Sequence, residues 1–308
     1  MFKINKNAVK SDKSIASIIF KIICFTILVG YAFSILFTFG LAVLTSLLPY
    51  ESFRLYFPIL PLGEHFTMQN YIDVFSVFKV EITLSDGNKA YANIFGMLIN
   101  SIVFACGSAF LGSAFCCLMA YAVSKFKNWV SKVIYTTVIV CMALPVVGSL
   151  PSELTMMYNL NLYDTKFGLL FLSSSFLGMH FLVFHASFSA IPKDFSEAAK
   201  IDGAGEWRIF LSIMVPLVKM TFFTIFLLKF MVFWNNYEVP LIHTPNHPVL
   251  AYGVFCVLHN VVPDELDWDP RIPHHLAASM LVLLPMLVIF LFSHKRLIGN
   301  VSMGGVKG

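Results

Sequence analysis

The chain has 308 residues, of which 58% are hydrophobic and only 12% carry a charge. Soluble domains carry about 25% charged residues, so this composition excludes a soluble enzyme or binding domain and indicates a polytopic membrane protein. The formal net charge of +4 is small. Because the basic residues gather between apolar segments, they indicate membrane orientation and no nucleic-acid surface.

Six apolar segments predict an all-α membrane protein with six transmembrane helices. An α-helix needs about 20 residues to cross about 30 Å of hydrocarbon. Five segments of that length contain no Asp, Glu, Lys or Arg, and a sixth is interrupted only by Lys229. The membrane domain covers residues 22–294, between an N-terminal tail, 1–21, and a C-terminal tail, 295–308. Its predicted spans are 22–48, 94–123, 133–152, 167–187, 213–236 and 273–293.

The basic residues predict the orientation of these spans. Most of the 21 Lys and Arg residues lie in the two tails and in residues 125–132 and 193–219. Cytoplasmic loops are enriched in Lys and Arg. Both termini and the loop 188–216 are therefore predicted to be cytoplasmic.

Two long segments are predicted on the opposite side, at residues 49–92 and 238–273. Both are long for plain connectors. They are expected to pack on each other or on a partner, and the alternative is unstructured loops. In the first segment, Asp86-Gly87 predicts a turn between two short extended pieces.

The loop 188–216 contains the polar stretch DFSEAAKIDGAGEWRIF, residues 194–210. Asp194 and Glu197 have the spacing of a capping box, which predicts a short helix over 195–201. Gly203 and Gly205 predict a sharp turn, after which a helical pattern leads into the fifth span. Such an elbow is either an amphipathic connector at the membrane surface or a docking knob for another protein.

Glu197-Ala198-Ala199, Gly203 and Ile213-x-x-Pro216 resemble the EAA signature of binding-protein-dependent ABC importer permeases. The string EAAKIDGA is similar to the form found in carbohydrate importers of the maltose-permease type. Two further segments, WNNY at 234–237 and VSMGGVKG at 301–308, are also similar to segments of that family. Val215 stands where the signature usually has Leu.

The resemblance implies the MetI-like fold of type I ABC importer permeases and a bacterial inner (plasma) membrane location. It implies partners: a second homologous permease, two cytoplasmic ABC ATPases and an extracytoplasmic solute-binding protein. The elbow is then expected to dock on the ATPase. The expected ATPase-coupling residues are Glu197, Ala198, Ala199, Ile201, Asp202, Gly203 and Ala204. The C-terminal Gly304, Gly305 and Lys307 are expected to contact the ATPase as well.

The sequence contains no motif for catalysis or nucleotide binding. G-x-x-x-x-G-K-[ST], H-E-x-x-H and G-x-S-x-G are all absent, and the six Cys show no metal-ligand spacing. The chain is therefore predicted to be a transport subunit without catalytic residues, metal or cofactor of its own. ATP and Mg²⁺ are expected on the partner ATPase.

Polar residues inside the predicted spans are the candidates for the translocation pathway: Asn100, Lys229, Asn235 and Asn236. A Lys at the middle of a membrane costs about 2.5–3.5 kcal/mol, so it should face protein or water. Lys229 is expected either to line the solute path or to pair with a carboxylate or carbonyl of the partner permease. The Asn side chains either bind sugar hydroxyls or join neighbouring helices.

Together these features predict a permease that imports a sugar or oligosaccharide by alternating access. The same fold could import another solute, such as glycerol phosphate or a polyamine, and a secondary carrier is the remaining alternative. The sequence does not name the solute.

Overall fold

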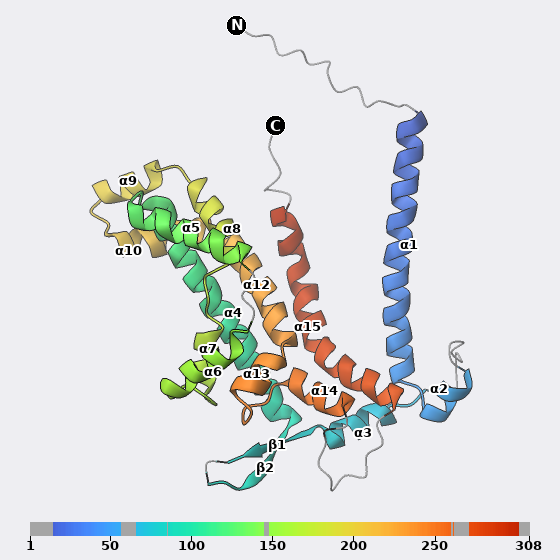
Figure 1. Ribbon diagram of the computed structural model, residues 1–308. Coiled ribbons are helices and arrows are strands. Elements are labelled where there is room, and N and C mark those ends of the chain that lie inside the picture. Colours follow the sequence, from blue (N-terminus) through green and yellow to red (C-terminus); the bar gives the residue numbers. More distant parts are fainter. Residues whose placement is uncertain are drawn as a thin grey trace. The chain divides into compact units, whose positions relative to one another are not determined.

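Figure 1 shows the computed structural model, which describes residues 15–56, 66–84, 86–144, 148–259, 261 and 271–301. Helices dominate these residues, as expected for an all-α membrane protein. Three of them are long and apolar enough to cross a membrane: α1 (Ile15–Ser46), α4 (Ile94–Lys125) and α15 (Ile272–Val301). A fourth candidate is a pair, residues 206–217 joined to α12 (Lys219–Asn235), bent by 76°. The total of six spans stays a prediction.

The chain divides into two compact units, one within residues 1–71 and 271–277 and the other within 72–270 and 278–308. The first unit contains α1, α2 (Tyr50–Tyr56) and the start of α3 (Gln69–Val77). Asn70 is buried, and its side-chain amide donates to the carbonyls of Ser46 and Leu48 at 2.9 and 2.8 Å. This amide satisfies carbonyls that the end of α1 leaves without a helical partner.

The second unit is organised around α4, which packs mainly against α12 and α8 (Met179–Ser189). Asn93 begins α4, because its side chain accepts a hydrogen bond from the Gly96 amide at 2.9 Å. Small residues let the neighbouring helices approach α4 closely. The fully buried ones are Ala105, Ser108, Ala109, Ser113 and Ala120.

A β-hairpin precedes α4. Strand β1 (Lys79–Thr83) pairs antiparallel with β2 (Lys89–Asn93). Gly87 has a φ of +80° in the turn, and the Asp86 carboxylate accepts from the backbone and side-chain amides of Asn88. These hydrogen bonds hold the pKa of Asp86 below its ordinary value. The predicted turn at Asp86-Gly87 is confirmed.

Within the second unit, the described residues of 72–92 pack against those of 238–258. The later segment contains α13 (Glu238–His243) and α14 (Leu250–Leu258). Between them, the Asn246 side chain accepts from the Thr83 amide at 2.6 Å and donates to Asp164 at 2.6 Å. This bridge joins the hairpin to two other loops.

The helices α5 (Trp129–Ala143), α6 (Leu150–Asn159) and α7 (Lys166–Leu172) lie between α4 and α8 in the chain. The predicted spans 133–152 and 167–187 are thus interrupted in the structure, the second of them at residues 173–178. Gly178 has a φ of +139°, outside the helical region, and the Ser175 hydroxyl accepts from the Leu177 amide at 3.2 Å. Such local side-chain bonds compete with helical pairing, which explains the break.

Candidate functional site

The polar elbow, residues 194–217, consists of α9 (Asp194–Ile201), α10 (Glu206–Ile209), the π-helical turn η1 (Phe210–Met214) and α11 (Val215–Leu217). Gly203 ends α9 with a φ of +77°, a conformation that side chains with a Cβ rarely adopt. The chain therefore reverses between α9 and α10, as predicted. Figure 1 shows the two helices side by side at the end of the bundle that also holds the start of α5.

The expected capping box at the start of α9 is wrong. The helix begins one residue earlier than predicted, with Lys193 as the N-cap and no side-chain capping bond. Asp194 is therefore already helical. Together with Glu197 it lies in the first turn, where carboxylates interact favourably with the positive end of the helix dipole.

The expected ATPase-coupling residues divide into an exposed set and an anchoring set. Ala199 is only 8% exposed and belongs to the main hydrophobic cluster, and Ala204 is half-buried. The others are exposed: Glu197, Ala198, Ile201, Asp202 and Gly203. Ile201 stands out because this large apolar side chain is 87% exposed.

One ion pair links α9 and α10 within the elbow. Lys200 of α9 and Glu206 of α10 approach to 2.6 Å across the turn, and both side chains are about half exposed. Exposed pairs of this kind contribute about 0–1 kcal/mol. The pair therefore helps to fix the angle between α9 and α10 more than it stabilises the fold.

Aromatic packing fastens the elbow to the helices behind it. Phe210 is 7% exposed, and its ring centroid lies 4.9 Å from that of Tyr121 of α4, which in turn lies 5.5 Å from Phe188 of α8. Lys125, at the end of α4, donates to the carbonyl of Ile191 at 3.1 Å. The elbow is thus attached to both α4 and α8.

A bend joins the elbow to α12. The segment 206–217 and α12 meet at Val218 at 76°, whereas the sequence predicted a single span from residue 213. Pro216 has no amide hydrogen to donate and interrupts regular helical pairing. Next to it, η1 forms a π-helical turn, a feature common at functional sites. The long apolar helix therefore begins at Lys219.

A cavity of about 350 Å³ lies between the elbow and the end of α4. Its walls carry both charges of the elbow pair and further basic side chains. The charged lining residues are Lys125, Lys127, Lys193, Glu197, Lys200 and Glu206. The elbow thus combines a polar hollow with an exposed apolar tip at Ile201.

Lys229 lies within α12, half-buried, and its ammonium donates to the carbonyl of Ser175 at 3.4 Å. Ser175 belongs to the break between α7 and α8. A carbonyl partner was one of the two predicted alternatives, but here it comes from the same chain. Gly112 of α4 faces this ammonium: a Cβ at that position would lie 2.9 Å from Lys229 Nζ.

The three Asn candidates all make hydrogen bonds within the chain. Asn100 donates to the carbonyl of Pro248 at 3.0 Å, and Asn236 accepts from the Val239 amide at 3.0 Å. Asn235 donates to Met231 within its helix and to the sulfur of Met286 on α15. These contacts agree with a role in joining elements, and contact with a solute stays a prediction. Gly304, Gly305 and Lys307 lie outside the described residues.

Sequence reasoning missed Gly112 and the break at residues 173–178. There Ser173-Ser174-Ser175 interrupt a segment that was predicted as one continuous span. A signal was present: the serines and Gly178 separate two apolar stretches that are each too short to cross a membrane.

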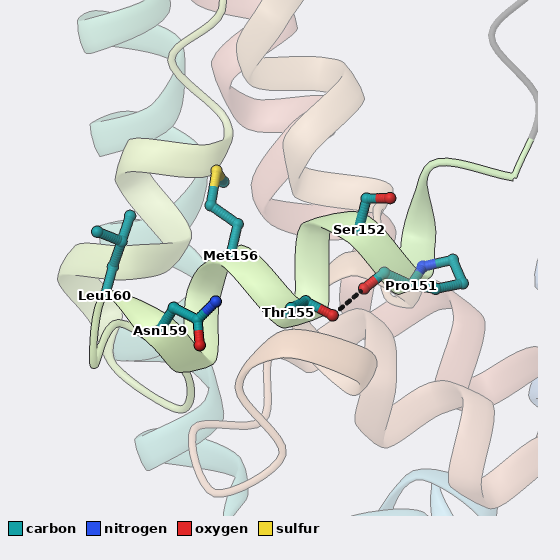
Figure 2. Close-up of a pocket in the computed structure, with 6 residues that line it drawn as sticks. All are labelled: Pro151, Ser152, Thr155, Met156, Asn159 and Leu160. Carbon is teal, nitrogen blue, oxygen red and sulfur yellow. Dashed lines mark hydrogen bonds between the residues drawn. The ribbon is translucent and has the colours of Figure 1, made fainter.

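Two other hollows carry less chemistry. Figure 2 shows a shallow pocket of about 550 Å³ along α6, formed by Pro151, Ser152, Thr155, Met156, Asn159 and Leu160. Five of these belong to α6, Leu160 caps its end, and none is charged. A larger hollow of about 780 Å³ borders the hairpin and His247. Burial lowers the pKa of His247; the nearby Asp164 carboxylate opposes this shift, and the charge of Lys166 adds to it.

The geometry defines a helical membrane protein in which an exposed polar elbow packs against α4 and α8 and continues into α12. A family model for the "Binding-protein-dependent transport system inner membrane component" matches residues 112–292, more than half of the chain. The protein belongs to this family. It is therefore a multi-pass permease subunit of an ABC importer, a transport component and not an enzyme. The resemblance based on the EAA signature is confirmed.

Relatives and solved structures agree with this assignment. The melibiose/raffinose/stachyose import permease MelC of Bacillus subtilis is 27% identical over 237 residues, 75% of this chain and 84% of the relative. The sn-glycerol-3-phosphate permease UgpE of Yersinia pestis is 28% identical over 240 residues, 73% and 84% of the two chains.

The fold is also that of a bacterial ABC transporter that imports the acidic polysaccharide alginate. The TM-score is 0.72 at 20% sequence identity, over 92% of this chain and 98% of the other. A structure of a bacterial alginate transporter in complex with a pentasaccharide-bound periplasmic protein matches with a TM-score of 0.55 at 16% identity, over 91% and 95%.

Proposed function

We propose that this chain is one of two permease subunits of an ATP-driven importer that moves a sugar or oligosaccharide into the cell by alternating access. The proposal is supported by the names of the relatives, which include an importer of raffinose-type sugars, and by the likeness to a polysaccharide importer. An extracytoplasmic solute-binding protein delivers the solute, as the family description implies.

The elbow is the proposed docking site for a cytoplasmic ABC ATPase. The observation that carries this proposal is the division of α9 between exposure and anchorage. Ile201, Glu197 and Ala198 are exposed for contact, while Ala199 packs into the same cluster as Phe210. A force that the ATPase applies to α9 would therefore be transmitted to α4 and α8, which pack against the elbow.

Two ATPase subunits supply the energy in this proposal, with ATP and Mg²⁺ bound to them and no cofactor on the permease. The elbow then faces the cytoplasm with both termini. The excess of Lys and Arg on that side supports this orientation. The C-terminal Gly304, Gly305 and Lys307 are proposed as a second ATPase contact.

A phosphorylated polyol is a second candidate solute. The glycerol-phosphate permease UgpE is as similar to this chain as the sugar permease MelC. Lys229 would suit such a solute, because an ammonium forms strong charge-assisted hydrogen bonds with phosphate.

The function is tested by substituting Gly203. At a φ of +77°, valine is expected to cost about 1–2 kcal/mol in strain, which shifts the turn about tenfold toward other conformations that no longer present α9 to the ATPase. Cells carrying Gly203→Val should lose solute uptake and retain little ATPase in a pull-down from membranes, although the permease still inserts. Glu197→Ala should do the same without backbone strain.

Gly205→Ala is the matched control, since Gly205 has an ordinary φ of −71° and open space around its α-carbon. It should leave both uptake and ATPase retention unchanged. Full ATPase retention in both Gly203→Val and Glu197→Ala would show that the elbow is not the docking site.

A further inference from the structure

Lys229 forms no ion pair with any Asp or Glu in the part of the chain that the structure describes. It lies ten residues after the start of α12, about 15 Å along the helix axis. The sequences of α4, α5, α7, α8, α12 and α15 contain no Asp or Glu. A charge within a membrane protein is normally paired or faces a water-filled path, so the surroundings of Lys229 indicate its role.

The ammonium lies against an irregular piece of backbone. Its one hydrogen bond among the described residues goes to the Ser175 carbonyl at 3.4 Å, within the break between α7 and α8. The thiol of Cys116 contacts the same carbonyl and that of Phe176, at 3.9 and 3.6 Å. Because these carbonyls lie between two helices, they are available to other donors, such as the hydroxyls of a sugar ring.

Irregular backbone at membrane depth is tolerated only inside protein or beside water. Transporters use such broken helices to bind their substrates near the middle of the membrane. The break at residues 173–178 therefore places polar backbone where a solute could contact it.

The absence of a side chain at Gly112 is what lets the ammonium lie directly against α4. A Cβ there would lie 2.9 Å from Lys229 Nζ and 3.4 Å from the Ser173 carbonyl. An ammonium has three donors, and the single long hydrogen bond to Ser175 occupies one of them. The other two N–H groups can donate to an anionic ligand without breaking a strong internal bond.

Two other groups add polar character without adding negative charge. His180 stands at the start of α8, five residues after Ser175, whose carbonyl binds Lys229. Ser108 is fully buried, one helical turn before Gly112 on the same face of α4, and its hydroxyl has no hydrogen-bond partner among the described residues. Both groups are polar and neither carries a negative charge.

We propose that Lys229 binds the carboxylate or phosphate group of a negatively charged, hydroxyl-bearing solute as it crosses the membrane. This inference rests on the proposed function and narrows its solute to uronic-acid oligosaccharides or phosphate esters of sugars and polyols. It disfavours a polyamine, since a cation would be repelled by Lys229. It also makes Lys229 part of the solute site and not a pairing partner of the second permease.

The test uses cells that carry the complete importer: both permeases, the ATPase and the binding protein. Uptake is measured with labelled trigalacturonate, sn-glycerol 3-phosphate and raffinose, which represent the carboxylate, phosphate and neutral cases. The variants are Lys229→Gln, Lys229→Arg and, as a control on the same helix, the exposed Lys219→Gln. Co-purification of the second permease and of the ATPase reports assembly.

The expected result is uptake of one acidic probe, with a KM about tenfold higher in Lys229→Gln because a charged hydrogen bond is lost. Lys229→Arg should recover most of this loss, Lys219→Gln should match the unaltered protein, and all variants should assemble normally. The acidic probe that is taken up identifies the source of the negative charge.

Uptake confined to raffinose, uptake of no acidic probe, or an unchanged KM for the acidic probe in Lys229→Gln would overturn the inference. So would loss of the second permease from purified Lys229→Gln complexes, because Lys229 would then pair with the partner. The proposed function is tested separately. Raffinose uptake that requires Gly203 and Glu197 would support the proposed function even if the inference about Lys229 is overturned.

Discussion

The elbow and the surroundings of Lys229 use charge in opposite ways. In the elbow, charged side chains such as Glu197, Lys200 and Asp202 are exposed to solvent, and the one ion pair between α9 and α10 is half exposed. At Lys229, one ammonium lies half-buried against the Ser175 carbonyl, opposite Gly112. Exposed charges are screened by water and contribute little energy, whereas a charge within a membrane is expensive and restricts its neighbours.

This difference shows which interactions stabilise each region. The elbow is held by apolar contacts behind it, through Ala199, Phe210 and Met214, and its charges are available for a partner. The Lys229 site is held by the helices α4, α8 and α12 around it. Substitutions should therefore act on the elbow through its apolar anchors, and on the Lys229 site through its space and charge.

The largest effect is expected from Phe210→Ala. Removal of a buried aromatic side chain costs about 3–5 kcal/mol, and Phe210 is only 7% exposed beside Tyr121. The thermal unfolding midpoint of the purified permease should fall, and uptake should decrease strongly because the elbow loses its link to α4.

Leu211→Ala is the neighbouring control, since Leu211 is 60% exposed and should leave the unfolding midpoint nearly unchanged. Equal midpoints for the two variants would contradict the view that apolar anchoring holds the elbow.

An intermediate effect is expected from a graded series at Gly112. Alanine places a Cβ 2.9 Å from the Lys229 ammonium, which can move away, and 3.4 Å from the Ser173 carbonyl, which cannot move easily. Gly112→Ala should raise the KM for the acidic probe about threefold, and Gly112→Val more, since overpacking costs about 1–3 kcal/mol. ATPase retention in a pull-down should not change in either variant. A KM that stays constant through Gly112→Val would argue against solute binding beside α4.

The smallest effect is expected from the ion pair of the elbow. Lys200→Gln or Glu206→Gln should change the free energy of unfolding by less than about 1 kcal/mol. Uptake should fall at most modestly, and it should recover in the double variant with Lys200→Glu and Glu206→Lys, which restores the pair. A large loss of ATPase retention that the charge-swapped variant does not restore would show that Lys200 or Glu206 contacts the ATPase directly.

The sequence predicted the elbow better than it predicted the membrane core. Gly203 and the EAA signature locate a turn and a helix because both depend on nearby residues, and α9 differs from its predicted bounds by one residue. The break at 173–178 and the bend at Val218 were not predicted, because an apolar segment looks alike whether it is straight or interrupted. The contact between Gly112 and Lys229 could not be predicted, because the two residues lie 117 positions apart in the sequence and only the fold brings them together.

In the proposed mechanism, the bend at Val218 sets the direction in which a movement of the elbow would act on α12. With 76° between the two arms, a displacement along residues 206–217 is directed almost wholly across α12 and hardly along it. The helix α12 would then tilt, with little translation along its own axis. Lys229 would keep its depth in the bilayer while its distance from α4 and from residues 173–178 changes. In this mechanism the solute site would open by a lateral separation of the helices, and Lys229 would not move along the membrane normal.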